Sequence, residues 1–180
     1  MLATIAYRML SKAVIRGAVC MSCVAGYDAI PIVDLRGQLP TAGEYPTRDL
    51  ARINATVIHH TATRGQTIRS IADYHIQVKG WRGVAYHFAI GWDGTVYQLN
   101  GVDRKTNHAK DNNTHTIGVA LVGNYDRNEP SVAMLQSAAA LVAYLRDAYH
   151  AERVLFHRDL KATDCPGRFA VIALDSLHIR

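Results

Sequence analysis

The sequence predicts an α/β domain with a mixed central β-sheet flanked by helices. Short β-branched and apolar runs alternate along the chain with stretches whose apolar residues recur at helical spacing. One Asp-Gly pair, Asp93-Gly94, lies between two such runs and predicts a hairpin, so the sheet is not purely parallel. With 180 residues, 49% of them apolar, the chain is long enough for one domain with its own core and an appendage.

The first elements of this domain follow from local patterns. Residues 29–49 are rich in Pro, Gly, Thr and charge, and predict an extended linker that wraps onto a domain starting near Leu50. Ala55–His60 is a β-branched run that predicts a buried strand ending in histidine. Thr67 is a good N-cap, and the helix that it begins is expected to reach Lys79, before a terminating glycine.

The remaining elements continue the alternation. Residues 84–90 and 96–99 are expected to form the two strands of the hairpin. Residues 116–122 read as a continuous apolar strand. Ser131 is expected to cap a long amphipathic helix that reaches about Tyr149. The chain then predicts a strand over Arg153–Phe156 and a last helix over residues 166–177, which begins at a proline.

Charge and cysteine content restrict the function classes. The net charge of +5 suits a polyanionic partner such as an acidic membrane face or an anionic cell-wall polymer. Basic residues are not interleaved with aromatic ones, so we expect no nucleic-acid partner. Three cysteines are too few for a disulfide scaffold. Cys20 and Cys23 form a single C-x2-C pair, interpreted as small apolar residues, with a metal site or a disulfide after export as alternatives.

Residues 1–28 are interpreted as a basic leader that precedes a domain spanning residues 29–180. Arg8, Lys12 and Arg16 recur every four residues and would form one basic stripe on an amphipathic helix. The same segment also resembles a signal peptide with a long charged start and cleavage near Ala25-Gly26. The third interpretation is a helix that only packs against the domain. An ordinary membrane span is excluded because the sequence has no stretch of 18 uncharged apolar residues.

The most specific motif joins His157 and Cys165, which lie eight positions apart near the end of the chain. The pair His59-His60 lies far upstream, and its members face opposite sides of a strand, so one of them can enter a given site. Two imidazoles and one thiolate suit zinc, and three protein ligands leave the fourth position open for a catalytic water. The alternatives are a Cys165 nucleophile activated by His157, and a structural zinc with His108 as fourth ligand.

A hydrolytic zinc also needs donors that steady a developing oxyanion. Tyr86 is the best candidate, because its phenol can point at the site while its two neighbours face away. Thr163, two residues before the ligand cysteine, adds a hydroxyl.

These residues lie in a set of motifs that resembles the type 2 zinc-dependent N-acetylmuramoyl-L-alanine amidases, a superfamily that includes phage endolysins and peptidoglycan-recognition proteins. The resemblance covers residues 55–169, and its motifs read VIHHTAT (57–63), GVAYHF (83–88), DGTV (93–96), NHA (107–109), IGVALVG (117–123) and HRD (157–159) to CPG (165–167). It implies a zinc held by His59, His157 and Cys165, and a catalytic tyrosine at Tyr86. Phage-type members commonly carry a lysine two positions before the ligand cysteine. This chain has Thr163 at that position, as members of the recognition branch have a threonine there.

The resemblance implies a peptidoglycan hydrolase that cleaves the amide between the lactyl group of N-acetylmuramic acid and L-alanine with zinc-activated water. The alternative is a non-catalytic peptidoglycan-binding module on the same fold; such proteins typically lack the ligand cysteine, which this chain keeps. His108 and Asn113 are expected to contact the glycan or the stem peptide. Activity is expected at the bacterial cell wall, after secretion or release as an endolysin, with the leader contacting anionic membrane or lipopolysaccharide.

Overall fold

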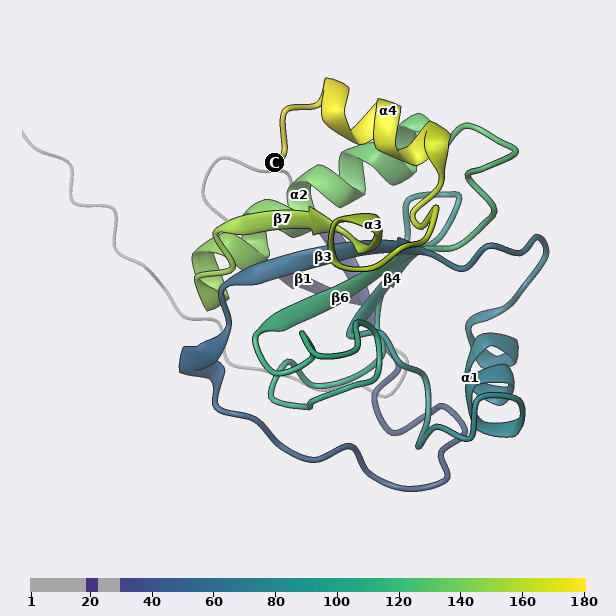
Figure 1. The fold of residues 1–180 in the computed structure, drawn as a ribbon, viewed down its shortest axis with the longest axis vertical. Helices are drawn as coiled ribbons and strands as arrows, with labels where there is room; N and C mark the ends of the chain where they lie inside the picture. The colour runs from purple at the N-terminus through teal and green to yellow at the C-terminus, as the bar shows by residue number, and fades with distance from the viewer. Residues whose placement is uncertain (1–18, 23–29) are drawn as a thin grey trace, which may run out of the picture.

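The computed structural model describes residues 19–22 and 30–180, which are drawn in colour in Figure 1. Their strands form one seven-stranded sheet in the order β1-β2-β5-β4-β6-β3-β7. The strands are β1 (Val19–Ser22), β2 (Ile30–Asp34), β3 (Ala55–His60), β4 (Phe88–Ile90), β5 (Val96–Gln98), β6 (Thr116–Leu121) and β7 (Arg153–Phe156). Strands β4, β6, β3 and β7 run parallel to one another, whereas β5 is antiparallel to β4. The mixed sheet predicted from the sequence is confirmed.

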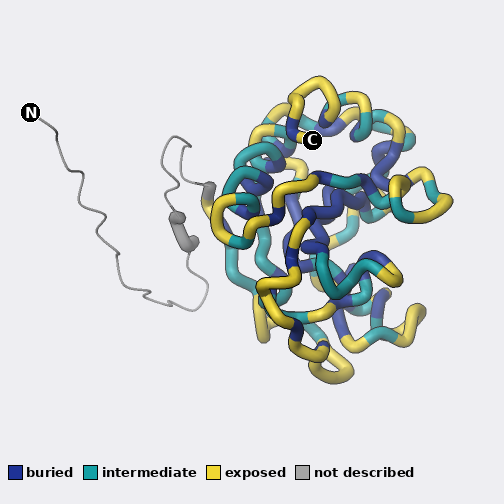
Figure 2. The backbone as a smooth tube through the Cα atoms, turned by 60° about the vertical axis from the view of Figure 1, so that its left-hand side comes forward, coloured by how far each residue is buried: buried dark blue, intermediate teal, exposed yellow. Residues whose placement is uncertain are grey.

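Helices cover both faces of this sheet. They are α1 (Ile68–Gln77), α2 (Val132–Tyr149), α3 (His157–Leu160) and α4 (Arg168–Ser176), with a short 3-10 turn at Leu50–Arg52. Helices α2 and α4 pack on one face over the main core, and α1 lies on the other face over a smaller core (Figure 1). Figure 2 shows that the buried backbone runs through the centre and that the exposed segments are turns at the periphery. None of the described helices is both long and apolar enough to cross a membrane.

The predicted N-caps are confirmed. The Thr67 hydroxyl accepts a hydrogen bond from the Ser70 amide at 3.1 Å, and the Ser131 hydroxyl accepts one from the Met134 amide at 3.1 Å. Because the capping residues satisfy amides that the first helical turn leaves unpaired, both helices begin at the residue after the cap.

The segment before Leu50 is more than the linker that the sequence predicted. Ile32 to Asp34 pair in parallel with β5, so this segment adds a strand to the sheet. Farther along, the buried Arg48 guanidinium donates to the carbonyls of Val102, Asn113 and Thr116 at 2.9, 2.7 and 2.6 Å. Burial lowers the pKa of Arg48 to about 10, which leaves it charged at neutral pH. Residues 30–49 are therefore part of the domain.

Two other predicted elements differ in extent. The strand predicted over residues 84–90 is confirmed only for Phe88–Ile90. The predicted start of the last helix at Pro166 was wrong, because Gly167 has φ of 95° and ψ of 146°, which lies outside the helical region, and α4 begins after it. A Cβ at Gly167 would lie 2.4 Å from the carbonyl carbon of Tyr125, so this position requires glycine.

The basic stripe predicted for the leader lies outside the described residues. Within residues 1–28, the structure describes Val19–Ser22, which form strand β1 and pair antiparallel with β2 instead of continuing a helix.

Helix α1 carries a buried histidine that makes stability depend on pH. His75 accepts a hydrogen bond from the Ala85 amide at 3.1 Å through Nδ1, and burial, aided by Lys79, lowers its pKa from 6.5 to about 4. Between these two values the unfolded chain binds more protons than the folded one, so stability is complete above pH 6.5 and is lost as the pH falls toward 4.

We therefore expect His75→Asn to flatten this pH dependence, because asparagine keeps an acceptor for the amide but does not titrate. Denaturant unfolding at pH 7.0, 5.5 and 4.5, with chelator present so that metal release does not contribute, measures the effect. An unchanged pH slope in the variant would contradict the assignment.

Candidate metal centre

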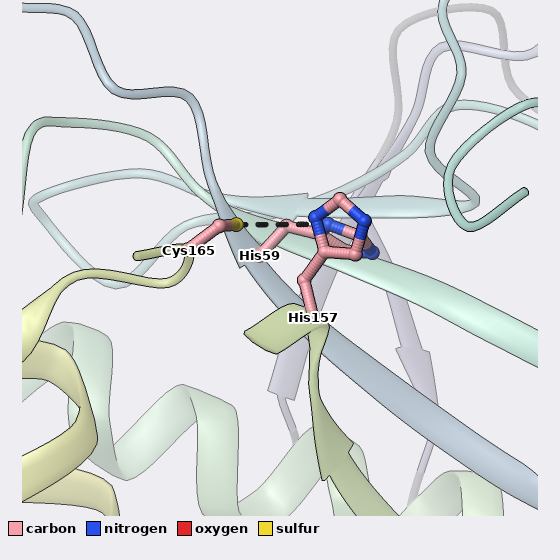
Figure 3. Close-up of side chains that lie close together, drawn as sticks. All are labelled: His59, His157 and Cys165. Carbon is pink, nitrogen blue, oxygen red and sulfur yellow. Dashed lines mark hydrogen bonds between the residues drawn. The ribbon is translucent and has the colours of Figure 1, made fainter. Parts of the chain in front are cut away.

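Three side chains that could hold a metal converge where strands of the sheet end. His59 lies next to the end of β3, His157 directly follows β7, and Cys165 lies in the loop between α3 and α4. Their ligand atoms all lie within 4.8 Å of one another, and Figure 3 shows the three side chains pointing toward one centre. Among the described residues this is the one group of three or more metal-ligating side chains.

The register of the sheet brings the two imidazoles together. Strands β3 and β7 are parallel neighbours, and Ile58 lies opposite Phe156. The residues that follow, His59 and His157, therefore come side by side, with ring centroids 4.5 Å apart. Two candidate ligands that are 98 positions apart in sequence thus become neighbours through one pair of strands.

The loop before α4 supplies the thiol. The His60 amide donates to Cys165 Sγ at 3.4 Å, and the Arg158 amide donates to the Cys165 carbonyl at 2.9 Å. The sulfur lies 3.8 Å from His59 Nδ1, along the dashed line in Figure 3. A tetrahedral zinc with ordinary Zn–S and Zn–N bonds separates its sulfur and nitrogen ligands by about 3.6 Å. The donor set and its spacing therefore fit zinc.

His60 lies on the opposite face, as the alternation of a strand predicts. Its Nδ1 accepts a hydrogen bond from the Tyr125 amide at 3.2 Å, and its Nε2 lies 3.8 Å from an Asp126 carboxylate oxygen. The first histidine of the pair therefore enters the centre, and the second supports the packing beneath it.

Burial controls protonation at this centre. Desolvation, reinforced by the neighbouring imidazoles of His108 and His157, lowers the pKa of His59 well below 6.5. Desolvation also lowers the pKa of His157 and raises the pKa of Cys165 to about 12. The imidazoles are thus neutral, the form that binds metal, and the thiol needs a metal to become a thiolate near neutral pH.

A cavity of about 210 Å³ opens onto the three ligands. It is lined by His59, His60, Ala62, Trp81, Ala85, Tyr86, Asn107, His108, His157, Thr163 and Cys165. This volume is below the range of pockets that enclose a drug-sized ligand, so it suits a reacting group whose remaining substituents extend over the surface.

Tyr86 and Thr163 bring two hydroxyls to this cavity. The Tyr86 ring centroid lies 5.3 Å from that of His59, and burial, aided by Cys165, raises the pKa of the phenol, so it stays protonated. The Thr163 hydroxyl oxygen accepts a hydrogen bond from the Cys165 amide at 3.3 Å, which leaves its own proton available. Both groups are therefore hydrogen-bond donors beside the ligands.

Comparison with known families agrees with this geometry. The model of the N-acetylmuramoyl-L-alanine amidase family matches residues 49–168, which include all three ligands, Tyr86 and Thr163. The chain belongs to this amidase family. The buried His59, His157 and Cys165 group fits the zinc site typical of its amidases.

Relatives of this amidase-family chain include both enzymes and recognition proteins. Peptidoglycan-recognition protein SC1a of Drosophila melanogaster is 34% identical over 126 residues, which cover 64% of this chain and 68% of that protein. The solved structure of the N-acetylmuramoyl-L-alanine amidase LysC from Clostridium intestinale URNW superposes with a TM-score of 0.70 at 28% identity, covering 83% of this chain and 98% of LysC. Peptidoglycan recognition protein-LE, solved in complex with tracheal cytotoxin, a monomeric diaminopimelic acid-type peptidoglycan, superposes with a TM-score of 0.67 at 26% identity, covering 73% and 85%.

Of the two residues expected to contact substrate, His108 lines the cavity and Asn113 does not. His108 borders the cavity but is only 5% exposed, and both of its ring nitrogens face protein atoms. Asn113 is not among the cavity-lining residues, and its amide oxygen accepts a hydrogen bond from the Ala109 amide at 2.7 Å. The Asn113 side chain thus stabilises the loop between residues 109 and 113 and does not face the cavity.

Sequence reasoning missed two cavity residues of this amidase-family site. Trp81 and Asn107 both line the cavity, and the Trp81 ring lies 4.9 Å from that of His75. The available signals were weak: Trp81 follows Gly80, just beyond the end of α1, and Asn107 stood in the NHA motif without a role of its own.

Proposed function

We propose that this chain is a zinc-dependent N-acetylmuramoyl-L-alanine amidase that hydrolyses the amide between the lactyl group of N-acetylmuramic acid and L-alanine of bacterial peptidoglycan. The observation that carries the proposal is the convergence of two neutral imidazoles and one thiol on an accessible cavity, with three protein ligands and no fourth among the described residues. Three ligands are typical of catalytic zinc, whereas structural zinc takes four.

The metal and the side chains around it have separate roles in this proposal. A zinc ion held there supplies a Lewis acid that polarises the carbonyl and lowers the pKa of a bound water. Tyr86 lines the cavity and its phenol is protonated, so it can donate to the oxyanion that develops on the lactyl carbonyl. Thr163 offers a second donor, because its oxygen is already positioned by the Cys165 amide.

The structure argues against Cys165 as a peptidase nucleophile. A reactive cysteine needs a lowered thiol pKa, whereas burial raises the pKa of Cys165 to about 12. A charged imidazolium beside the thiol would lower it, but burial lowers the pKa of both His59 and His157. The thiol is therefore better suited to bind a metal.

The remaining alternative is a peptidoglycan-binding module without catalysis, which the recognition proteins among the relatives suggest. Metal content and turnover separate the two. We expect about one zinc per chain, and complete loss of peptide release from purified cell wall after chelation, with recovery on adding zinc. Mass measurement of the products should show free L-alanine amino termini. Chelator-resistant cleavage would favour a thiol nucleophile, and zinc binding without cleavage would favour the recognition module.

We propose that the enzyme acts at the bacterial cell wall, in the periplasm or outside the cell, after secretion or release as an endolysin. The basic stripe of residues 1–28 is proposed to meet anionic membrane or lipopolysaccharide, which fits the net charge of +5. Residues 29–180 are proposed to form the amidase domain.

Deletion of residues 1–18, which removes the basic stripe and keeps strand β1, should therefore reduce killing of intact cells and leave cleavage of isolated wall unchanged. The truncated and complete chains are compared in both assays at equal concentration. Equal losses in the two assays would mean that the leader serves only to pack against the domain.

A further inference from the structure

His59 also contacts His108, through the ring nitrogen that does not face Cys165. Its Nε2 lies 3.1 Å from Nδ1 of His108, and the two rings meet edge to face with centroids 5.3 Å apart. His59 is 1% exposed and His108 is 5% exposed, so no solvent can replace this contact. Each of the two facing nitrogens must therefore be satisfied by the other.

The surrounding bonds determine which nitrogen carries each proton. His108 Nε2 faces both the carbonyl and the hydroxyl oxygen of Thr116, each at 3.2 Å. The Thr116 hydroxyl donates its proton to the Asn112 carbonyl at 2.7 Å, so both oxygens act as acceptors toward His108. His108 must then be protonated on Nε2 and present a lone pair on Nδ1.

This arrangement fixes the tautomer of His59 in turn. Since His108 Nδ1 is an acceptor, His59 Nε2 must carry the proton that joins the two rings. The remaining lone pair of His59 lies on Nδ1, the atom 3.8 Å from Cys165 Sγ. The opposite tautomer of His59 would set two buried lone pairs against each other and turn a proton toward the metal position.

Two further residues hold His108 in place. Arg48 donates to the Thr116 carbonyl at 2.6 Å, which anchors the acceptor end of the chain. Gly118 leaves room for the ring, because a Cβ there would lie 2.5 Å from His108 Cγ. The position of the His108 ring is thus built by residues from three parts of the domain.

We propose that His108 is a positioning residue for the metal centre: it locks His59 in the orientation and tautomer that present Nδ1 to the ion. Histidine ligands usually donate their second N–H to a carboxylate, a carbonyl or water, and here a neutral imidazole takes that role. The proposal rests on the metal centre of the proposed function and does not depend on amide cleavage.

Zinc affinity, measured by competition with a chelator, tests this role. His108→Leu removes both bonds and should weaken zinc binding about 10–100-fold, the usual loss when a partner of a metal ligand is removed. His108→Asn keeps an acceptor near the Nδ1 position and should recover most of that affinity. Gly118→Ala, which alters no polar group but displaces the ring, should weaken binding as His108→Leu does.

His115→Asn is the matched control, since His115 lies in the same loop and bonds Asn112 instead of His59. It should bind zinc like the natural chain. If His108→Leu does not fold, His108→Gln replaces it, because the longer amide reaches Thr116 but leaves no acceptor at the Nδ1 position.

The tautomer itself is visible in nitrogen chemical shifts of the metal-free protein. His59 should be protonated on Nε2 in the natural chain and should show a mixture of tautomers in His108→Leu. Equal zinc affinity and an unchanged tautomer in the variants would overturn the proposal. If the variants differ from the natural chain in zinc affinity and tautomer but the natural chain cleaves no wall, the proposed function fails while the role of His108 stands.

Discussion

Cys165→Ser is expected to abolish release of stem peptide from cell wall. Serine is close in size to cysteine, but its hydroxyl is a poor ligand for zinc at neutral pH. Without the ion, the pKa of the attacking water returns from about 7 to about 15.7, so turnover should fall by more than about 1,000-fold. Wall digestion, with zinc content measured on the same sample, tests this result.

The fold should survive this change, because Cys165 belongs to neither hydrophobic core cluster and a serine hydroxyl can also accept the hydrogen bond from the His60 amide. Circular dichroism and thermal unfolding of the metal-free proteins should therefore agree between the variant and the natural chain. Cys20→Ser and Cys23→Ser are the matched controls and should keep both zinc and activity. Turnover that persists in Cys165→Ser would exclude this set of ligands.

Tyr86→Phe is expected to lower kcat about 100- to 1,000-fold, the usual cost of removing one oxyanion donor. Tyr86 lines the cavity, and the raised pKa of its phenol keeps the donating proton in place across the working pH range. Zinc affinity and KM should change little, because the ring remains and the ligands are untouched.

Tyr45→Phe provides the control for losing a buried phenol elsewhere. The Tyr45 hydroxyl donates to the Gly83 carbonyl at 2.8 Å and does not line the metal cavity. Its loss should reduce the free energy of unfolding by about 1 kcal/mol and leave kcat unchanged. A normal kcat in Tyr86→Phe would show that the phenol takes no part in catalysis. It would not count against the proposed metal centre.

The three candidate ligands could be proposed from sequence because each of them stands beside a recognisable local feature. His59 lies at the end of a β-branched run, His157 follows another, and Cys165 precedes a Pro-Gly turn. Adjacent parallel strands align such ends, so local patterns were enough to suggest convergence. The choice between His59 and His60 needed the family resemblance, since alternation alone says only that they face apart.

The segment before β4 looked like a strand for a physical reason. Val84 and Ala85 are buried and apolar, but their polar backbone groups are satisfied by side chains instead of a neighbouring strand. The Asn100 amide donates to the carbonyls of Val84 and Tyr86 at 2.9 and 2.7 Å, and His75 accepts from the Ala85 amide. Such long-range side-chain bonds leave no mark on local periodicity.

Two other differences have the same origin. Strand β2 was hidden because Pro31 and the turn residues after it read as a linker, although the pairing with β5 begins only at Ile32. His108 was expected to contact the glycan or the stem peptide because it stands in a polar loop. Its burial depends on Gly118, which belongs to a different element.

The alignment of β3 with β7 has a consequence for folding. A slip of one residue between these strands would turn His59 to the opposite face of the sheet and bring Ile58 or His60 beside His157. Only the native alignment brings the three candidate ligands together, and a ligand that binds one arrangement stabilises that arrangement over the others. A zinc ion bound at this centre would therefore stabilise correctly paired chains relative to misaligned ones.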